Sequence, residues 1–91
     1  MSSHPLETGE RDRDAVAKGI VRVLVKILKV RPEQIRSDSR LIIDLRADSL
    51  DLAEIAAELE DEFHVKVEEE QVHMIATVGE AIDYVRRLQR S

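Results

Sequence analysis

Ser49 is the side chain best placed for covalent chemistry, because it follows Asp48 at the predicted start of a helix. Aspartate is a favoured N-cap residue, so Ser49 would be the first helical residue and its hydroxyl would point into solvent. A serine hydroxyl there is a weak nucleophile, but another enzyme can reach it. A phosphate ester on it would lie near unpaired backbone N–H groups and the positive end of the helix dipole. The position therefore suits a covalently attached phosphorylated group.

Other patterns of catalytic or metal-binding residues are missing from the sequence. The Gly-x-Ser-x-Gly turn of a serine hydrolase is absent, and none of the three histidines has an evident role as a base. The chain has no cysteine, which excludes disulfides and thiolate ligands. The acidic runs at 60–62 and 68–70 lack the spacing and the glycine of a calcium-binding loop, and His64 and His73 lack zinc-ligand partners. We expect neither an enzyme nor a metal site.

The net charge of −5 is unevenly distributed along the chain. Residues 44–70 hold 11 of the 19 acidic side chains and 2 of the 14 basic ones, a net charge of −9. Such a field attracts basic protein surfaces and repels nucleic acid. The apolar runs are far shorter than the roughly 20 residues of a membrane span, and the start does not resemble a signal peptide. We therefore expect a cytoplasmic monomer with protein partners, no nucleic acid and no membrane span.

The hydrophobic pattern predicts an all-α fold, a small up-and-down helical bundle with three longer helices and one short helix. Residues 1–10 are expected to be a disordered tail, and residues 11–91 one domain. The first helix runs from about Asp12 to Lys29 and ends before Pro32, with Gly19 as a weak point costing up to about 1 kcal/mol. Residues 33–47 form a long connection whose apolar side chains fold back on the core, namely Leu41, Ile42 and Leu45.

The second helix is predicted from Ser49 to about Phe63, and at 100° per residue it has three distinct faces. The core face holds Leu52, Ile55, Ala56, Leu59 and Phe63. An acidic arc holds Asp51, Glu54, Glu58, Asp61 and Glu62. Beside it lies a third strip with Leu50, Ala53 and Ala57. Because the arc has no compensating base four residues away, partner steering explains it better than a merely solvated face. One or two helical turns follow within residues 68–75, and a Thr77–Glu80 capping box starts the last helix.

The segment around Asp48-Ser49-Leu50 resembles the acyl carrier protein family, whose serine in this tripeptide carries 4′-phosphopantetheine. The resemblance covers roughly residues 12–88 and includes the apolar run at 41–45, the acidic second helix and the last helix from Thr77. It implies a non-catalytic carrier that receives the group from coenzyme A on Ser49 through a phosphopantetheinyl transferase. It also implies acyl intermediates held as thioesters for acyl-transfer and chain-elongation enzymes, in fatty-acid, lipid or polyketide-type biosynthesis. Basic patches of these partners would dock on Asp51, Ala53, Glu54, Ala57, Glu58 and Asp61.

Several positions depart from the family pattern, among them the run at 68–70, which lacks the proline often found there. Arg46 stands where glycine is common; it is either a tolerated loop substitution, a partner for the phosphate of the prosthetic group or a positive mark for a dedicated enzyme. Ala53 and Ala57 are smaller than the family's usual residues, which favours a specialised, discrete carrier. A peptidyl or aryl carrier of a modular assembly system is the alternative within the class. An unmodified acidic helical adaptor is the alternative outside it.

Overall fold

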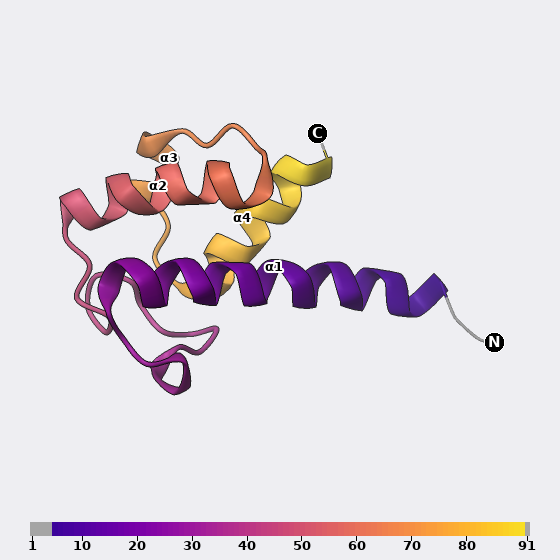
Figure 1. The fold of residues 1–91 in the computed structure, drawn as a ribbon, viewed down its shortest axis with the longest axis horizontal. Helices are drawn as coiled ribbons and strands as arrows, with labels where there is room; N and C mark the ends of the chain where they lie inside the picture. Colours follow the sequence, from indigo (N-terminus) through magenta and orange to yellow (C-terminus); the bar gives the residue numbers. More distant parts are fainter. Residues whose placement is uncertain (1–4, 91) are drawn as a thin grey trace.

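The computed structural model describes residues 5–90, with side chains from residue 15 onward. This part of the chain forms four α-helices and one short 3-10 helix (Figure 1). Their bounds are α1 Pro5–Leu28, η1 Pro32–Gln34, α2 Ser49–Phe63, α3 Glu69–His73 and α4 Val78–Arg90. The prediction of an all-α bundle with three longer helices and one short one is confirmed.

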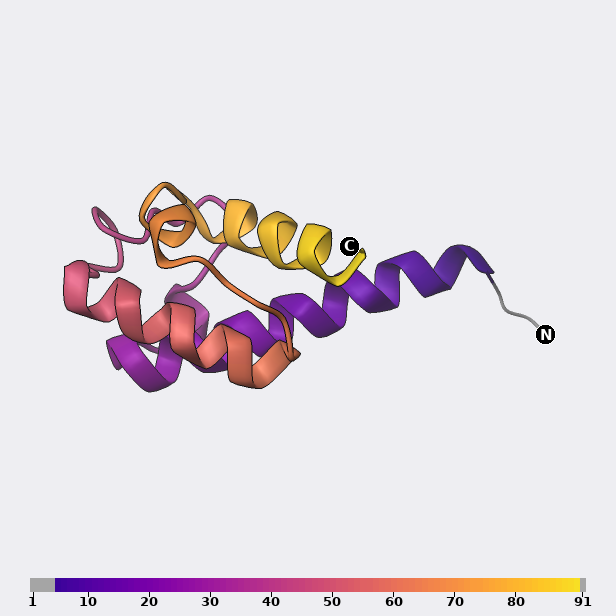
Figure 2. The ribbon, with the colours of Figure 1, turned by 90° about the horizontal axis from the view of Figure 1, so that it is seen from above.

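Helix α1 is the longest element, and both α2 and α4 pack against it. Figures 1 and 2 show that α2 and α4 each run opposite to α1. They have the same sense because the segment between them carries the chain back past α2, with α3 packed on α2. That segment is tied down at two points. The backbone N–H of Val67 donates to Glu60 Oε2 at 2.8 Å, and that of Glu68 donates to the Tyr84 hydroxyl at 3.3 Å.

The core between the helices is made almost entirely of aliphatic side chains. Helix α1 contributes one stripe to it, with Val16, Ile20, Val23 and Leu24 buried. The predicted core face of α2 is confirmed at Leu52, Ile55, Ala56 and Leu59. Helix α4 adds Val78, Ala81, Ile82, Tyr84 and Val85. Each helix therefore buries one face at helical spacing, which is how an amphipathic helix contributes to a small bundle.

Helix α1 differs from its predicted bounds at both ends. It begins at Pro5, where proline is favourable because the first helical residue needs no N–H partner. It therefore includes residues 5–10 of the predicted disordered tail, while residues 1–4 lie outside the described part. At the other end Lys29 adopts a left-handed backbone with φ of 59°, and its N–H donates to Val25 O at 3.0 Å. This cap ends α1, and Pro32 instead begins η1.

The helices after the connection begin close to their predicted positions. The bounds of α2 agree with the prediction, and His64 ends it with φ of 56°. At the start of α4 the Glu80 N–H donates to Thr77 Oγ1 at 3.2 Å, as the capping-box pattern predicts. The reciprocal bond differs, since Glu80 Oε1 accepts from the N–H of Ala76 at 2.8 Å rather than from that of Thr77.

Gly19 has a packing role that its helical propensity does not indicate. A Cβ at this position would lie 2.5 Å from Cζ of Phe63, closer than van der Waals contact allows. Phe63 is the last residue of α2 and is half-buried. The missing side chain of Gly19 therefore gives the aromatic ring its place against α1.

Replacing Gly19 by alanine is expected to destabilise the protein by up to about 2 kcal/mol. Alanine gains about 1 kcal/mol of helix propensity, but crowding the ring costs roughly 1–3 kcal/mol. Urea unfolding followed by circular dichroism measures the difference. In a Phe63→Leu background the crowding is relieved, so Gly19→Ala should become neutral or stabilising. An equal loss in both backgrounds would show that Phe63 is not the cause.

Candidate functional site

The connection before Ser49 is held by backbone hydrogen bonds to the start of α4. The N–H groups of Val78 and Gly79 donate to Ser39 O at 3.0 Å and Ser37 O at 2.8 Å, and Leu41 N–H donates to Ala76 O at 3.0 Å. A Cβ on Gly79 would lie 3.1 Å from Ser37 O, so glycine permits this close approach. Residues far apart in the sequence thus fix the course of the chain toward the predicted site.

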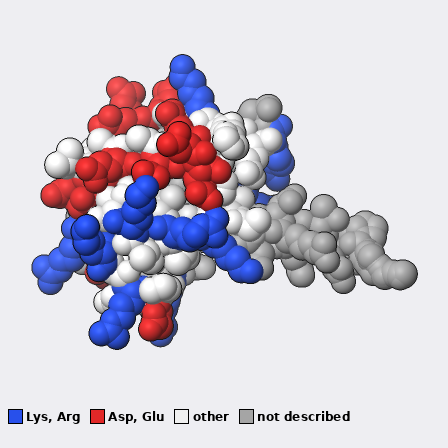
Figure 3. Space-filling view, in the orientation of Figure 1, with Lys and Arg blue, Asp and Glu red and all other residues white. Residues whose placement is uncertain are grey.

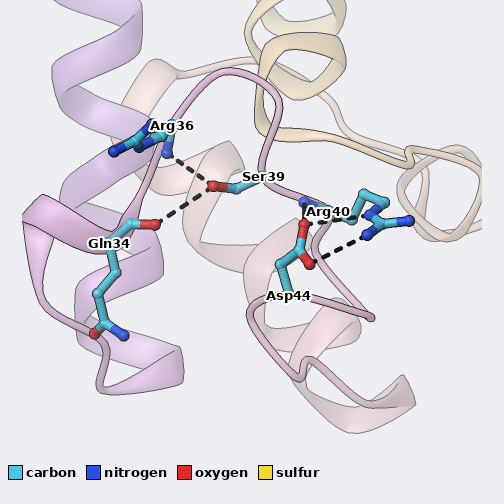
Figure 4. Close-up of polar contacts among 5 residues, drawn as sticks. All are labelled: Gln34, Arg36, Ser39, Arg40 and Asp44. Atoms are coloured by element: carbon cyan, nitrogen blue, oxygen red, sulfur yellow. Dashed lines mark hydrogen bonds and ion pairs between the residues drawn. The ribbon is translucent and has the colours of Figure 1, made fainter.

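Polar side chains stabilise the same connection from within (Figure 4). The buried Ser39 hydroxyl accepts from the N–H of Arg36 at 2.9 Å and donates to Gln34 O at 3.4 Å. Asp44 Oδ2 accepts from the backbone N–H of Arg40 at 2.8 Å and from its Nε at 3.2 Å. The hydrogen bonds between residues 40 and 44 stabilise the turn that leads toward Ser49.

Hydrogen bonding lowers the pKa of Asp44 below its ordinary value of 3.8, chiefly through the Arg40 backbone N–H and then its guanidinium. A lowered pKa in the folded state means that the ionised carboxylate is the stabilising form. Its contribution is therefore complete above the ordinary pKa and is lost as pH falls through the folded-state pKa. The turn is weakened only in strong acid.

Two of the three apolar residues predicted to fold back on the core do so. Leu41 and Leu45 are buried, but Ile42 is 54% exposed, so the prediction was wrong for Ile42. The tight turn places residues four apart on the same side, and Ile42 therefore faces away from Leu41 and Leu45. Ala47, which the sequence did not single out, is buried in their place. The outward-facing residues line an apolar hollow of about 140 Å³, whose lining is Arg40, Ile42, Ile43, Ile75 and Ala76.

Ser49 begins α2 as predicted, behind a complete capping box. Asp48 Oδ1 accepts from the Asp51 N–H at 2.8 Å, and Asp51 Oδ2 accepts from the Asp48 N–H at 3.1 Å. Ser49 itself is exposed, and within the described residues its hydroxyl makes no hydrogen bond. Leu50 beside it is 69% exposed. The serine is thus fixed in position by its backbone while its oxygen is free to react.

Arg46 lies in the same loop, three residues before Ser49, with a left-handed φ of 65°. Its side chain is exposed, and within the described residues it forms no ion pair or hydrogen bond. The family's glycine at this position has a clear physical basis, because glycine adopts positive φ without the steric cost of a Cβ.

The acidic arc of α2 adjoins the basic face of α1. Figure 3 shows acidic side chains gathered over α2 beside a row of basic side chains over α1. Lys26 Nζ lies 3.0 Å from Glu58 Oε2, and Arg22 Nη2 lies 2.6 Å from Glu62 Oε2. The compensating bases that α2 lacks within its own sequence are therefore supplied by the neighbouring helix.

The predicted docking carboxylates of α2 form two groups, those engaged in contacts within the structure and those that are not. Glu58 is engaged with Lys26, and Asp51 is engaged in the capping box. Glu54 and Asp61 are exposed and form no ion pair or hydrogen bond within the described residues. On the adjacent strip Ala57 is exposed and Ala53 half-buried. Two of the predicted docking carboxylates are thus engaged within the fold, and two are exposed without a partner among the described residues.

Comparison with known proteins places the chain in a family. The family described as "Phosphopantetheine attachment site" matches residues 18–85. The acyl carrier protein of Wolinella succinogenes is 38% identical over 71 residues, which cover 78% of this chain and 93% of that protein. The acyl carrier protein of a Sulfurovum species is 36% identical over 74 residues, covering 81% and 99%. The chain belongs to the acyl carrier protein family.

Membership in the acyl carrier protein family identifies the prosthetic group of this chain. Proteins of the family are carriers rather than enzymes, and their prosthetic group is a covalently attached 4′-phosphopantetheine, which this chain shares. The exposed serine with an unengaged hydroxyl fits such an attachment. The described residues hold no cluster of three or more potential metal ligands. Each helix in the described part is too short or too polar to span a bilayer.

Charge reversal at Glu58 should cost more stability than reversal at Glu54, because only Glu58 forms an ion pair. Glu58→Lys places two cations together and loses an exposed ion pair, worth up to about 1 kcal/mol. We expect the melting temperature to fall by a few degrees for Glu58→Lys and to change little for Glu54→Lys. Adding Lys26→Glu to Glu58→Lys restores an opposite-charge pair and should recover the loss. A double variant no more stable than Glu58→Lys would contradict the cross-helix pairing.

Proposed function

We propose that Ser49 is the attachment point of the 4′-phosphopantetheine group. The observation that carries the proposal is an exposed hydroxyl without hydrogen-bond partners in the described part, at the first residue of a capped helix. The flanking residues support access, because Asp48 is held in the cap and Leu50 lies in solvent. Ser37 is also exposed, but it lies in the connection, where its backbone carbonyl is bonded to Gly79. Ser39 is buried.

Attachment creates one phosphodiester bond on Ser49 Oγ. The phosphopantetheinyl group of coenzyme A is transferred to this oxygen, adenosine 3′,5′-bisphosphate leaves, and the transferase accepts the hydroxyl proton. The bound group supplies a thiol that carries acyl chains as thioesters, and the chemistry on those chains belongs to partner enzymes. The contribution of this chain is to present the arm at a fixed, solvent-exposed position and to raise the local concentration of its cargo at each partner.

The proposed partners are the transferase and acyl-processing enzymes with basic docking patches. Glu54 and Asp61 are the free carboxylates of α2, so they are the proposed principal contacts. Glu58 and Asp51 add to the same negative field while engaged in their own bonds. Ala53 and Ala57 would form a shallow apolar edge beside them. Such a surface increases association rates more than it increases final affinity.

The pathway we propose is the biosynthesis of fatty acids, lipids or polyketide-type products, with the protein acting as a discrete cytoplasmic monomer. The carrier name of its relatives supports the acyl class of cargo. The small side chains at Ala53 and Ala57 and the arginine at position 46 support a specialised set of partner enzymes.

Incubation with coenzyme A and a broad-specificity phosphopantetheinyl transferase should add the mass of one phosphopantetheine to the intact protein. Ser49→Ala should abolish the addition, while Ser37→Ala should leave it unchanged. Intact-mass and peptide mass spectrometry measure both. Modification that persists in Ser49→Ala would move the site elsewhere, and no modification by several transferases would favour an unmodified adaptor.

Docking should depend on Glu54 more than on a carboxylate outside α2. Glu54→Lys is expected to slow loading by the transferase several-fold at low salt and to weaken its salt dependence, because steering acts on the association rate. Glu33→Lys on η1 changes the net charge equally and is the matched control. Transferase kinetics at two ionic strengths measure the effect. Equal slowing in the two variants would indicate a response to net charge alone.

A further inference from the structure

Arg46 has a backbone conformation that the loop requires but that its side chain disfavours. Its neighbours Leu45 and Ala47 are both buried, and the turn of residues 41–45 ends directly before it. The Ala47 N–H closes this turn by donating to Leu41 O at 2.9 Å. Arg46 adopts a left-handed conformation where this turn ends, and glycine would adopt it without steric cost. The chain nevertheless places a long cationic side chain there.

Lys29 and His64 are the other non-glycine residues with positive φ among those described. Each follows the end of a helix and donates its N–H to that helix, to Val25 O and Glu60 O respectively. Lys29 also lines a hollow that contains the carboxylates of Glu54 and Glu58. Arg46 has neither feature. Within the described residues its guanidinium has no anionic partner.

The charges around Ser49 would oppose a phosphodiester on its oxygen. Asp48 and Asp51 place two carboxylates at the start of α2, and their capping box already uses the N–H groups of both residues. The cation of Arg40 is engaged with Asp44. Arg46 is therefore an uncommitted cation in the loop that leads to Ser49. Three residues span at most about 11 Å of extended chain, and the flexible arginine side chain shortens the remaining gap.

We propose that Arg46 is a positioning residue that pairs with the phosphodiester of the arm on Ser49. A planar guanidinium can donate two parallel hydrogen bonds to phosphate oxygens, which fixes direction as well as distance. The pair would offset the two capping carboxylates and restrain the base of the arm near the loop. This inference rests on the proposed attachment at Ser49.

A cycle of four proteins tests the pair: the unmodified and the loaded forms of the wild type and of Arg46→Gln. Glutamine keeps a Cβ and hence the backbone strain, so only the charge is removed. The change in melting temperature on loading, measured at low ionic strength, should be more favourable in the wild type than in Arg46→Gln by about 1–6 °C. Arg46→Lys should keep part of the difference, and high salt should shrink it. The ³¹P chemical shift of the loaded protein should also change in Arg46→Gln.

Lys29→Gln is the matched control, because it removes a cation from the same backbone conformation outside the loop that leads to Ser49. It should leave both the loading-dependent change in melting temperature and the ³¹P shift unchanged. A change on loading that is equal in wild type and Arg46→Gln would overturn the inference, as would equal effects of Arg46→Gln and Lys29→Gln. Intact mass is measured first, since failure of the wild type to load at Ser49 would instead overturn the proposed function.

Discussion

The attachment of residues 37–47 to the first turn of α4 is the constraint on which the position of Ser49 depends. Two backbone hydrogen bonds join this connection to Val78 and Gly79, a third joins it to Ala76 just before the helix, and its Leu41, Leu45 and Ala47 are buried. Without these contacts a connection of this length would be free to move, and the start of α2 would move with it. The packing of the last helix therefore fixes the position of a side chain some 30 residues earlier in the sequence.

The carboxylates of helix α2 have several different roles in the structure. Glu58 and Glu62 hold α1, Glu60 holds the segment after α2, and Asp51 holds the cap. Glu54 and Asp61 remain directed at solvent. The self-repulsion of this acidic helix is therefore reduced where Glu58 and Glu62 pair with the cations of α1. In the proposed function Glu54 and Asp61 are the principal contacts for a partner, and the long-range field of the whole helix steers its approach.

The sequence predicts local features well because their causes lie within a few residues. The start of α2, its cap at Asp48 and its core face follow from side-chain type and from a period of 3.6 residues. The pairing of Arg22 with Glu62 could not be predicted in this way, because it joins residues 40 positions apart. The prediction for Ile42 was wrong for a related reason. A tight turn has no regular period from which the buried side of the chain can be assigned. The exposed Ser49 was found from its cap, whereas the positive φ of Arg46 was not predicted, although glycine at this position in the resembled family was a signal for it.

The hydrogen bond between the Glu68 N–H and the Tyr84 hydroxyl has a practical consequence. The chain has a single tyrosine and no tryptophan, and this tyrosine is buried on α4 while its oxygen contacts the segment that leads into α3. Its ultraviolet fluorescence therefore comes from one place in the molecule, the contact between α4 and the return segment. The protein contains its own optical probe there, and movement of that segment can be followed in the native chain without a label.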